Sequence, residues 1–159
     1  MNDEPQPSDP AEERADAQRA LERELRVLGR RFRQSAARNA QRLSPGMMPV
    51  VYTIFTTIAE DGPVTASTVV EELSTDKGLV SRAVRELESL GLIRRDPDPR
   101  DGRSSLLSAT PEGRERLHAV RTDGGDRIAR TLADWKVAEV RQLAVLLHAL
   151  AEGGAPERR

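Results

Sequence analysis

The sequence predicts a mainly α-helical protein with one small β-hairpin. Three observations support this fold class. Apolar residues recur every three or four positions over several stretches, which is the spacing of amphipathic helices. Two short helical stretches lie next to each other near the middle of the chain. Two strand-like pieces joined by a loop of Asp, Pro, Arg and Gly follow them directly, which is the pattern of a winged helix-turn-helix.

Length and composition limit the class of protein. The chain has 159 residues, 25 Lys and Arg against 26 Asp and Glu, and no cysteine. This length suits one domain, and the lack of cysteine excludes disulfides, thiolate catalysis and cysteine metal sites. The chain has no apolar run near the roughly 20 residues of a membrane span and no signal-peptide pattern, so a cytoplasmic protein without a membrane partner is expected. Because the net charge is close to zero, binding of nucleic acid must rest on local positive charge.

The two ends of the chain are expected to be tails. Residues 1–16 are acidic and Pro-rich and should be disordered, and residues 153–159 should be flexible. A helical region is predicted over residues 17–45, with an apolar stripe formed by Leu21, Leu25, Leu28 and Phe32. The many arginines of this region are interpreted as a solvated face, with phosphate contact as the alternative.

Two short helices should come next. Pro49 removes a backbone donor, so the first of them is predicted to begin only at Met48 or Pro49 and to run to Glu60, where an Asp-Gly-Pro sequence ends it. A short strand at residues 64–65 is predicted to follow. A helix from Ala66 to Leu73, capped by the threonine before it, completes this part of the chain.

The helix predicted over residues 76–90 has two different faces. Asp76 is its preferred N-cap, with Ser74 and Thr75 as alternatives. The apolar face comprises Val80, Ala83, Val84, Leu87 and Leu90. The other face comprises Lys77, Gly78, Ser81, Arg82 and Arg85. Arginine and lysine reach guanine edges or phosphates, serine donates to either, and glycine permits close approach to the DNA backbone. An ordinary amphipathic surface helix would look similar.

Residues 92–109 are predicted to form a hairpin, or wing, with strands at 92–95 and 104–109. The prolines and the Asp101-Gly102 pair of its loop favour a turn. Its arginines would project toward an adjacent minor groove, whose negative potential attracts guanidinium groups. These arginines are Arg94, Arg95, Arg100 and Arg103. Asp101 can hold a neighbouring arginine by a charge-assisted hydrogen bond. An ordinary polar hairpin is the alternative.

The run LVSRAVRELESLGLIRRDPDPRDGRSSLLSATPEG, residues 79–113, resembles the heart of the MarR (multiple antibiotic resistance regulator) family of winged helix-turn-helix repressors. In that family the recognition helix ends in Leu-Glu-x-x-Gly-Leu, which residues 87–92 match. The family's wing carries Asp-x-Arg, matched by residues 101–103, and leads to Thr-x-x-Gly, matched by residues 110–113. The resemblance implies that Arg103 enters the minor groove and that Asp101 pairs with a nearby arginine.

The resemblance also implies an arrangement for the whole chain. It covers residues 17–152, a single MarR-like domain with its winged helix-turn-helix lobe at 46–110. The helices at 17–45 and 111–152 would interlock two subunits. A homodimer is therefore expected, bound to double-stranded DNA at a roughly palindromic site.

After the hairpin the family has one long helix, which here would run from Pro111 to Leu132. Gly124 and Gly125 lie within it, and two helical glycines cost roughly 2 kcal/mol relative to alanines. We therefore predict a kink or a break near residues 122–125. A last helix is predicted from about Trp135 to Ala151.

Catalysis has little support in the sequence. His118 and His148 are the only histidines, and neither belongs to a metal-ligand spacing. The serines have no nucleophile-elbow context, and no glycine-rich phosphate loop follows a strand. We expect no enzyme, no catalytic residue, no cofactor and no metal site.

The function expected is that of a dimeric, sequence-specific transcriptional regulator, a repressor of a nearby operon. The expected DNA contacts are Thr75, Asp76, Lys77, Gly78, Ser81, Arg82, Arg85, Arg100, Asp101 and Arg103. The alternative is a winged-helix module for protein contacts or architecture, without its own operator.

The resemblance further implies that a small aromatic or phenolic ligand releases the DNA by shifting the recognition helices. Such a ligand would bind between the dimerisation helices and the winged lobe. Candidate lining residues are Met47, Met48, Tyr52, Phe55 and Trp135. Ordinary packing in the core is the alternative for the same residues.

Overall fold

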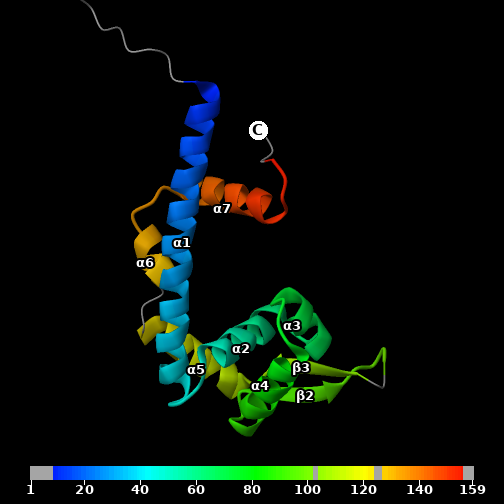
Figure 1. The fold of residues 1–159 in the computed structure, drawn as a ribbon. Coiled ribbons are helices and arrows are strands. Elements are labelled where there is room, and N and C mark those ends of the chain that lie inside the picture. Colours follow the sequence, from blue (N-terminus) through cyan, green and yellow to red (C-terminus); the bar gives the residue numbers. More distant parts are fainter. Residues whose placement is uncertain (1–8, 102–103, 124–126, 156–159) are drawn as a thin grey trace, which may run out of the picture. The chain divides into compact units, whose positions relative to one another are not determined.

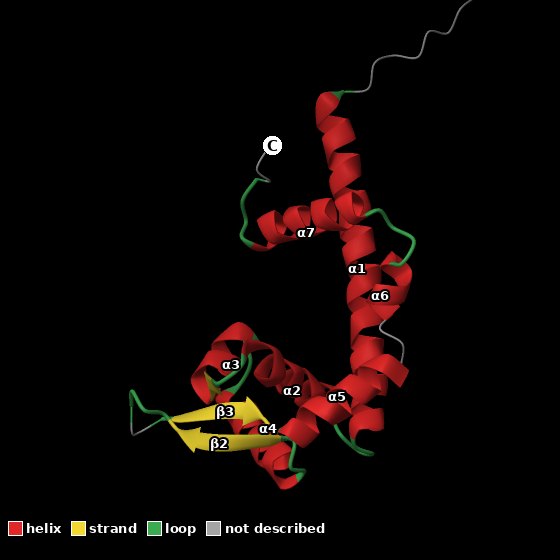
Figure 2. Ribbon diagram, turned by 180° about the vertical axis from the view of Figure 1, so that it is seen from behind, coloured by secondary structure: helices red, strands yellow, loops and turns green. Residues whose placement is uncertain are grey.

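The computed structural model describes residues 9–101, 104–123 and 127–155. In these ranges the chain is mainly helical and has one three-stranded sheet, whose two longer strands are the labelled arrows in Figure 2. Its contacts divide it into two compact units, Met1–Leu117 and His118–Arg159, and the single domain expected from the sequence stays a prediction. The first unit holds the sheet and, with one exception, every buried apolar residue of the described ranges, so it contains the core.

Helix α1 spans Pro10–Leu43 and begins earlier than predicted (Figure 1). Asp9 is its N-cap and accepts a hydrogen bond from the backbone N–H of Ala11 at 3.0 Å. A proline occupies the first turn, where its missing N–H costs nothing. The tail predicted for residues 1–16 is therefore wrong from Pro10 onward, because this local cap starts the helix. Residues 1–8 lie outside the described ranges, as do 156–159 of the other predicted tail.

Helix α2 spans Pro49–Asp61, so its delayed start at the proline is confirmed. Gly62, in the left-handed region with a φ of 82°, follows its last residue. Strand β1 (Val64–Thr65) and helix α3 (Ala66–Glu72) also confirm the prediction. The Thr65 hydroxyl accepts a hydrogen bond from a backbone N–H in the first turn of α3 at 3.1 Å, as a capping residue does.

Helix α4 spans Lys77–Ser89 and is the predicted recognition helix. Asp76 is its N-cap, and its Oδ1 accepts a hydrogen bond from Leu79 N at 2.9 Å. Gly91, with a φ of 69°, follows the end of the helix. The buried face of α4 packs toward α2 and α3 and consists of Val80, Ala83, Val84 and Leu87.

The sheet has the order β1-β3-β2 and is antiparallel throughout. Strand β2 spans Ile93–Pro97 and β3 spans Ser105–Ala109, with Ile93 opposite Ala109 and Pro97 opposite Ser105. Strand β2 extends two residues beyond the predicted strand. It can include a proline because it is an edge strand, where one side needs no N–H donor.

Three helices follow the sheet: α5 (Pro111–Asp123), α6 (Arg127–Leu132) and α7 (Val137–Ala151). The break predicted near Gly124–Gly125 falls on residues 124–126, outside the described ranges. Helix α7 begins two residues later than predicted, and Glu139 Oε2 accepts a hydrogen bond from the N–H of its N-cap residue at 2.9 Å. None of the helices in the described ranges combines the length and the apolar character that a membrane span requires.

Candidate nucleic-acid interface

The polar face of α4 lies on the surface. Its exposed residues are Lys77, Ser81, Arg82 and Arg85, while Gly78 is half-buried. Since the opposite face of α4 is buried in the core, the helix can present these side chains together. The two residues before the helix differ: Thr75 is half-buried, and Asp76 is exposed with its carboxylate engaged as the cap.

Gly78 leaves room for its neighbours at the start of α4. A Cβ at this position would lie 2.9 Å from Asp76 Oδ1 and 3.5 Å from Arg82 Nη1. A side chain here would therefore crowd the cap carboxylate, whereas its distance to Arg82 is an ordinary contact; the expected contact of Gly78 with DNA stays a prediction. One turn further along, Arg85 Nη2 donates a hydrogen bond to Ser81 Oγ at 3.2 Å. Both arginines are exposed.

Two of the four wing arginines are held by carboxylates. Arg95 Nε donates to Glu88 Oε1 at 3.2 Å, and Arg95 Nη2 donates to Glu88 Oε2 at 3.3 Å. Arg94 Nε lies 3.1 Å from Asp96 Oδ2 on the same strand. The prediction that all of these arginines project toward a groove is therefore wrong for Arg95, which turns toward α4. Of the other two, Arg100 is exposed and Arg103 lies outside the described ranges.

Asp98 organises the described part of the wing loop. Its Oδ1 accepts a hydrogen bond from Arg100 N at 2.8 Å, and its Oδ2 accepts one from Ser104 Oγ at 3.0 Å. The backbone N–H of Arg100 and then the Ser104 hydroxyl lower the pKa of Asp98, because both stabilise its ionised form. Asp98 was not among the residues predicted from the sequence to act in the wing. In turns, an Asp side chain often accepts a hydrogen bond from the backbone N–H two residues later, and this pattern could have identified Asp98 from the sequence.

Asp101 contributes to the same loop through its backbone. Its carbonyl accepts hydrogen bonds from Ser104 N at 2.9 Å and from Ser104 Oγ at 3.2 Å. The pairing of its carboxylate with an arginine stays a prediction, as does the groove contact of Arg103.

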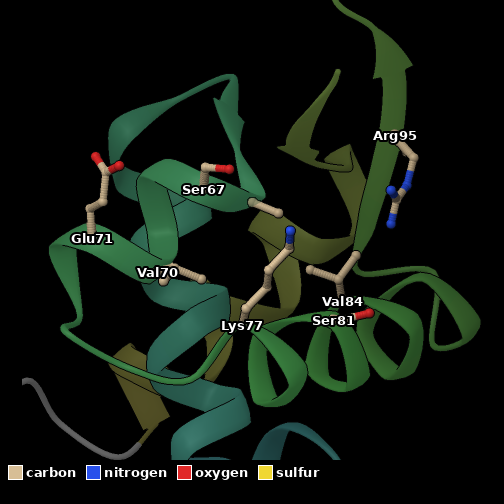
Figure 3. A pocket seen from close by; sticks show the side chains of 8 residues that line it. Ser67, Val70, Glu71, Lys77, Ser81, Val84 and Arg95 are labelled. Atoms are coloured by element: carbon tan, nitrogen blue, oxygen red, sulfur yellow. The ribbon is translucent and has the colours of Figure 1, made fainter. Parts of the chain in front are cut away.

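A cavity of about 340 Å³ lies where α3, α4 and β2 meet. Figure 3 shows Lys77 rising from the start of α4 between Val70 and Val84, with Arg95 on the neighbouring strand. Its lining consists of Ala66, Ser67, Val70, Glu71, Lys77, Ser81, Val84 and Arg95. The cavity therefore belongs to the same surface as the exposed face of α4. None of the residues predicted to bind an effector lines it.

The predicted effector residues lie in different surroundings. Met47, Tyr52 and Phe55 are buried, and Tyr52 Oη accepts a hydrogen bond from Asn39 Nδ2 at 3.2 Å. Met48 is exposed at the N-cap of α2. Trp135 is exposed and belongs to the second unit. For the three buried residues this favours core packing, the alternative that the sequence left open.

The described part of the chain shows no cluster of side chains suited to bind a metal ion. No group of three or more His, Cys, Asp or Glu residues is placed there to hold a metal ion. His118 and His148 are both exposed on helices. The surface described above consists of the helix pair α3 and α4, the exposed basic face of α4 and the hairpin of β2 and β3.

These features define a winged helix-turn-helix protein. A sequence profile described as the MarR family matches residues 46–104. The chain is 31% identical over 96 residues to the uncharacterized HTH-type transcriptional regulator YxaD of Bacillus subtilis, covering 60% of this chain and 67% of that protein. The chain therefore belongs to the MarR family, whose members are transcriptional regulators and not enzymes.

Solved structures of family members share this fold. Wild-type MarR from E. coli in its apo form gives a TM-score of 0.62 at 21% identity, covering 82% of this chain and 96% of that one. A putative MarR family regulator from Listeria monocytogenes, complexed with 26mer DNA, gives 0.68 at 21% identity, covering 82% and 86%. The predicted fold class, mainly α with a small β wing, is confirmed.

Proposed function

We propose that this chain binds double-stranded DNA with sequence preference and regulates transcription in this way. The observation that carries the proposal is the exposed face of α4, where Lys77, Arg82 and Arg85 lie on a helix anchored by its buried side. The major groove admits an α-helix, and arginine can donate two hydrogen bonds to a guanine edge. The Listeria relative, which was crystallised with DNA, supports the proposal.

The proposal includes a homodimer, which unpartnered apolar side chains support. On α1 the exposed apolar residues are Leu21, Leu25, Leu28 and Phe32. On α7 they are Val137, Leu143, Val145, Leu146, Leu147 and Leu150. Monomeric proteins rarely expose apolar patches of this kind, so a second copy of the chain is the partner we infer. A twofold dimer places its recognition helices about one DNA turn apart and selects a roughly palindromic site.

We further propose that the protein represses a nearby operon and that a small aromatic or phenolic ligand releases it. The support is the family resemblance alone, because Met47 and Tyr52, which lie where the end of α1 meets α2, are buried in the core. Methionine and aromatic side chains can rearrange around an apolar ligand. A ligand bound there would change the distance between the two recognition helices of the dimer and so the affinity for DNA.

Selection of genomic fragments with the purified protein tests this function. We expect enrichment of one roughly palindromic sequence, bound less tightly as the salt concentration rises because phosphate contacts release counterions. Addition of phenolic compounds should lower the yield of that sequence. A folded protein that enriches no sequence would contradict the proposal and favour a winged-helix module for protein contacts.

A further inference from the structure

The register of the sheet determines which way the Arg95 side chain points. In β2 it lies opposite Leu107, as Ile93 lies opposite Ala109. Side chains of directly opposed residues in antiparallel strands share one face of the sheet. Both β3 partners are buried, with exposed fractions of 0% for Leu107 and 4% for Ala109. Arg95 therefore lies on the core-facing side of the sheet.

On that side, Arg95 joins three elements. Besides the two hydrogen bonds to the Glu88 carboxylate, Arg95 Nη1 donates to Ser105 Oγ at 3.2 Å. Glu88 belongs to the last turn of α4, and Ser105 is the first residue of β3. We call these three residues the helix–wing clamp. The side chains of the ion pair are 31% exposed for Glu88 and 45% exposed for Arg95.

The helix–wing clamp lies where the sheet loses its third strand. Strand β1 pairs with Leu106 and Leu107 of β3. Along the described hairpin, the pair Pro97–Ser105 and the loop beyond it extend from two strands alone. A two-stranded ribbon is only marginally stable in water and twists readily. The ion pair between Arg95 of β2 and Glu88 of α4 therefore limits the movement of the outer hairpin relative to α4.

We propose that the helix–wing clamp sets the wing relative to the recognition helix for DNA binding, so that Glu88 and Arg95 are positioning residues. This inference rests on the proposed function, since it concerns how one protein engages two neighbouring grooves. A pre-ordered wing loses less conformational freedom on binding, which increases affinity. If the hydrogen bonds of the helix–wing clamp are broken, contacts of the wing with DNA should weaken, while the exposed face of α4 stays unchanged.

The charge of Glu88 gives the inference a sharp test. If Glu88 acted only through its charge, Glu88→Gln would increase affinity, because it removes a negative charge beside a DNA-binding helix. The helix–wing clamp predicts the opposite sign. We expect Glu88→Gln to bind the selected DNA about two- to fivefold more weakly, the range for a partly exposed ion pair. The matched control is Asp96→Asn, which removes the same charge from a pair confined to β2 and should not weaken binding.

A double-mutant cycle with Arg95→Gln separates positioning from direct contact. If Arg95 acts through Glu88, adding Arg95→Gln to Glu88→Gln weakens binding no further. If Arg95 contacts phosphate itself, its substitution costs the same in both backgrounds, and this result would overturn the inference. Glu88→Gln binding as tightly as the unaltered protein would overturn it as well.

Amide hydrogen exchange of the DNA-free protein tests the helix–wing clamp independently of the proposed function. Glu88→Gln should accelerate exchange in the outer part of β2 and β3 and leave the buried turns of α4 unchanged. Unchanged exchange in the hairpin contradicts the inference even if DNA binding is established. If the unaltered protein enriches no DNA, the proposed function fails instead.

Discussion

The hydroxyl of Thr110 donates a hydrogen bond to the backbone carbonyl of Gly91 at 2.6 Å and so ties the start of α5 to the end of α4. The same oxygen accepts a hydrogen bond from Gly113 N at 2.9 Å. The Thr-x-x-Gly sequence noted above therefore has a structural explanation. Its threonine satisfies a backbone N–H of α5 and holds the corner that follows α4.

Gly113→Ala should destabilise the fold. A Cβ at this position would lie 2.1 Å from the carbonyl oxygen of Leu92, and backbone atoms cannot move away cheaply. We expect a loss of about 1–3 kcal/mol in the free energy of unfolding, measured with urea. The control is Gly29→Ala in α1, where the nearest atom is the flexible end of Arg33 at 3.5 Å. It should gain up to about 1 kcal/mol in helix propensity, and equal effects of the two substitutions would contradict this explanation.

Asp76→Ala should remove the N-cap of α4. The carboxylate accepts the Leu79 N–H at 2.9 Å, so its loss leaves a donor of the first turn without this partner. We expect a cost of about 1 kcal/mol in the free energy of unfolding. Asp76→Asn keeps an acceptor at the same place and serves as the control. If both variants unfold at the same urea concentration, the side chain does not act as a cap.

The apolar stripe of α1 predicts the outcome of a charge substitution. Leu25 is 37% exposed in the single chain, so Leu25→Glu should leave the monomer folded while disrupting a dimer that buries this stripe. Arg30→Glu, on the opposite side of the helix at 3.6 residues per turn, is the control and should not change assembly. Sedimentation measures the difference. Dimers of undiminished stability with Leu25→Glu would place the interface elsewhere.

The order of the wing should depend on acid pH through Asp98. Its pKa is lowered in the folded chain, first by the Arg100 N–H and then by the Ser104 hydroxyl. The stabilisation is thus complete above the unfolded pKa of about 3.9 and is lost as the pH falls through the lower folded value. Exchange of the Arg100 amide, corrected for its intrinsic pH dependence, should accelerate only below about pH 4. Asp98→Asn should abolish this step, and a step at neutral pH would contradict the assignment.

Elements with strong local signals could be predicted from the sequence. Caps at Thr65 and Asp76, the proline that starts α2 and the glycine after α4 all act within a few residues of their own position. The apolar periodicity of α4 likewise predicted which of its residues are buried.

The helix–wing clamp could not be predicted in this way. The chemistry that lets Arg95 bind a phosphate also lets it bind a carboxylate, so its residue type does not indicate its partner. The direction of the Arg95 side chain follows from the register between β2 and β3, and this register is set by strand pairing across a loop. The seven residues of α1 before the predicted start were missed for a different reason, since their acidic composition resembled a tail although Asp9 caps them.

The central claim is that the exposed face of α4 reads DNA. Its most direct test is the affinity of Arg82→Ala and Arg85→Ala for the selected palindrome and for a scrambled duplex. If either arginine reads a base edge, its substitution should cost about 1–3 kcal/mol on the palindrome and much less on the scrambled duplex. If both variants bind the palindrome as tightly as the unaltered protein does, the face of α4 does not read DNA and the claim is contradicted.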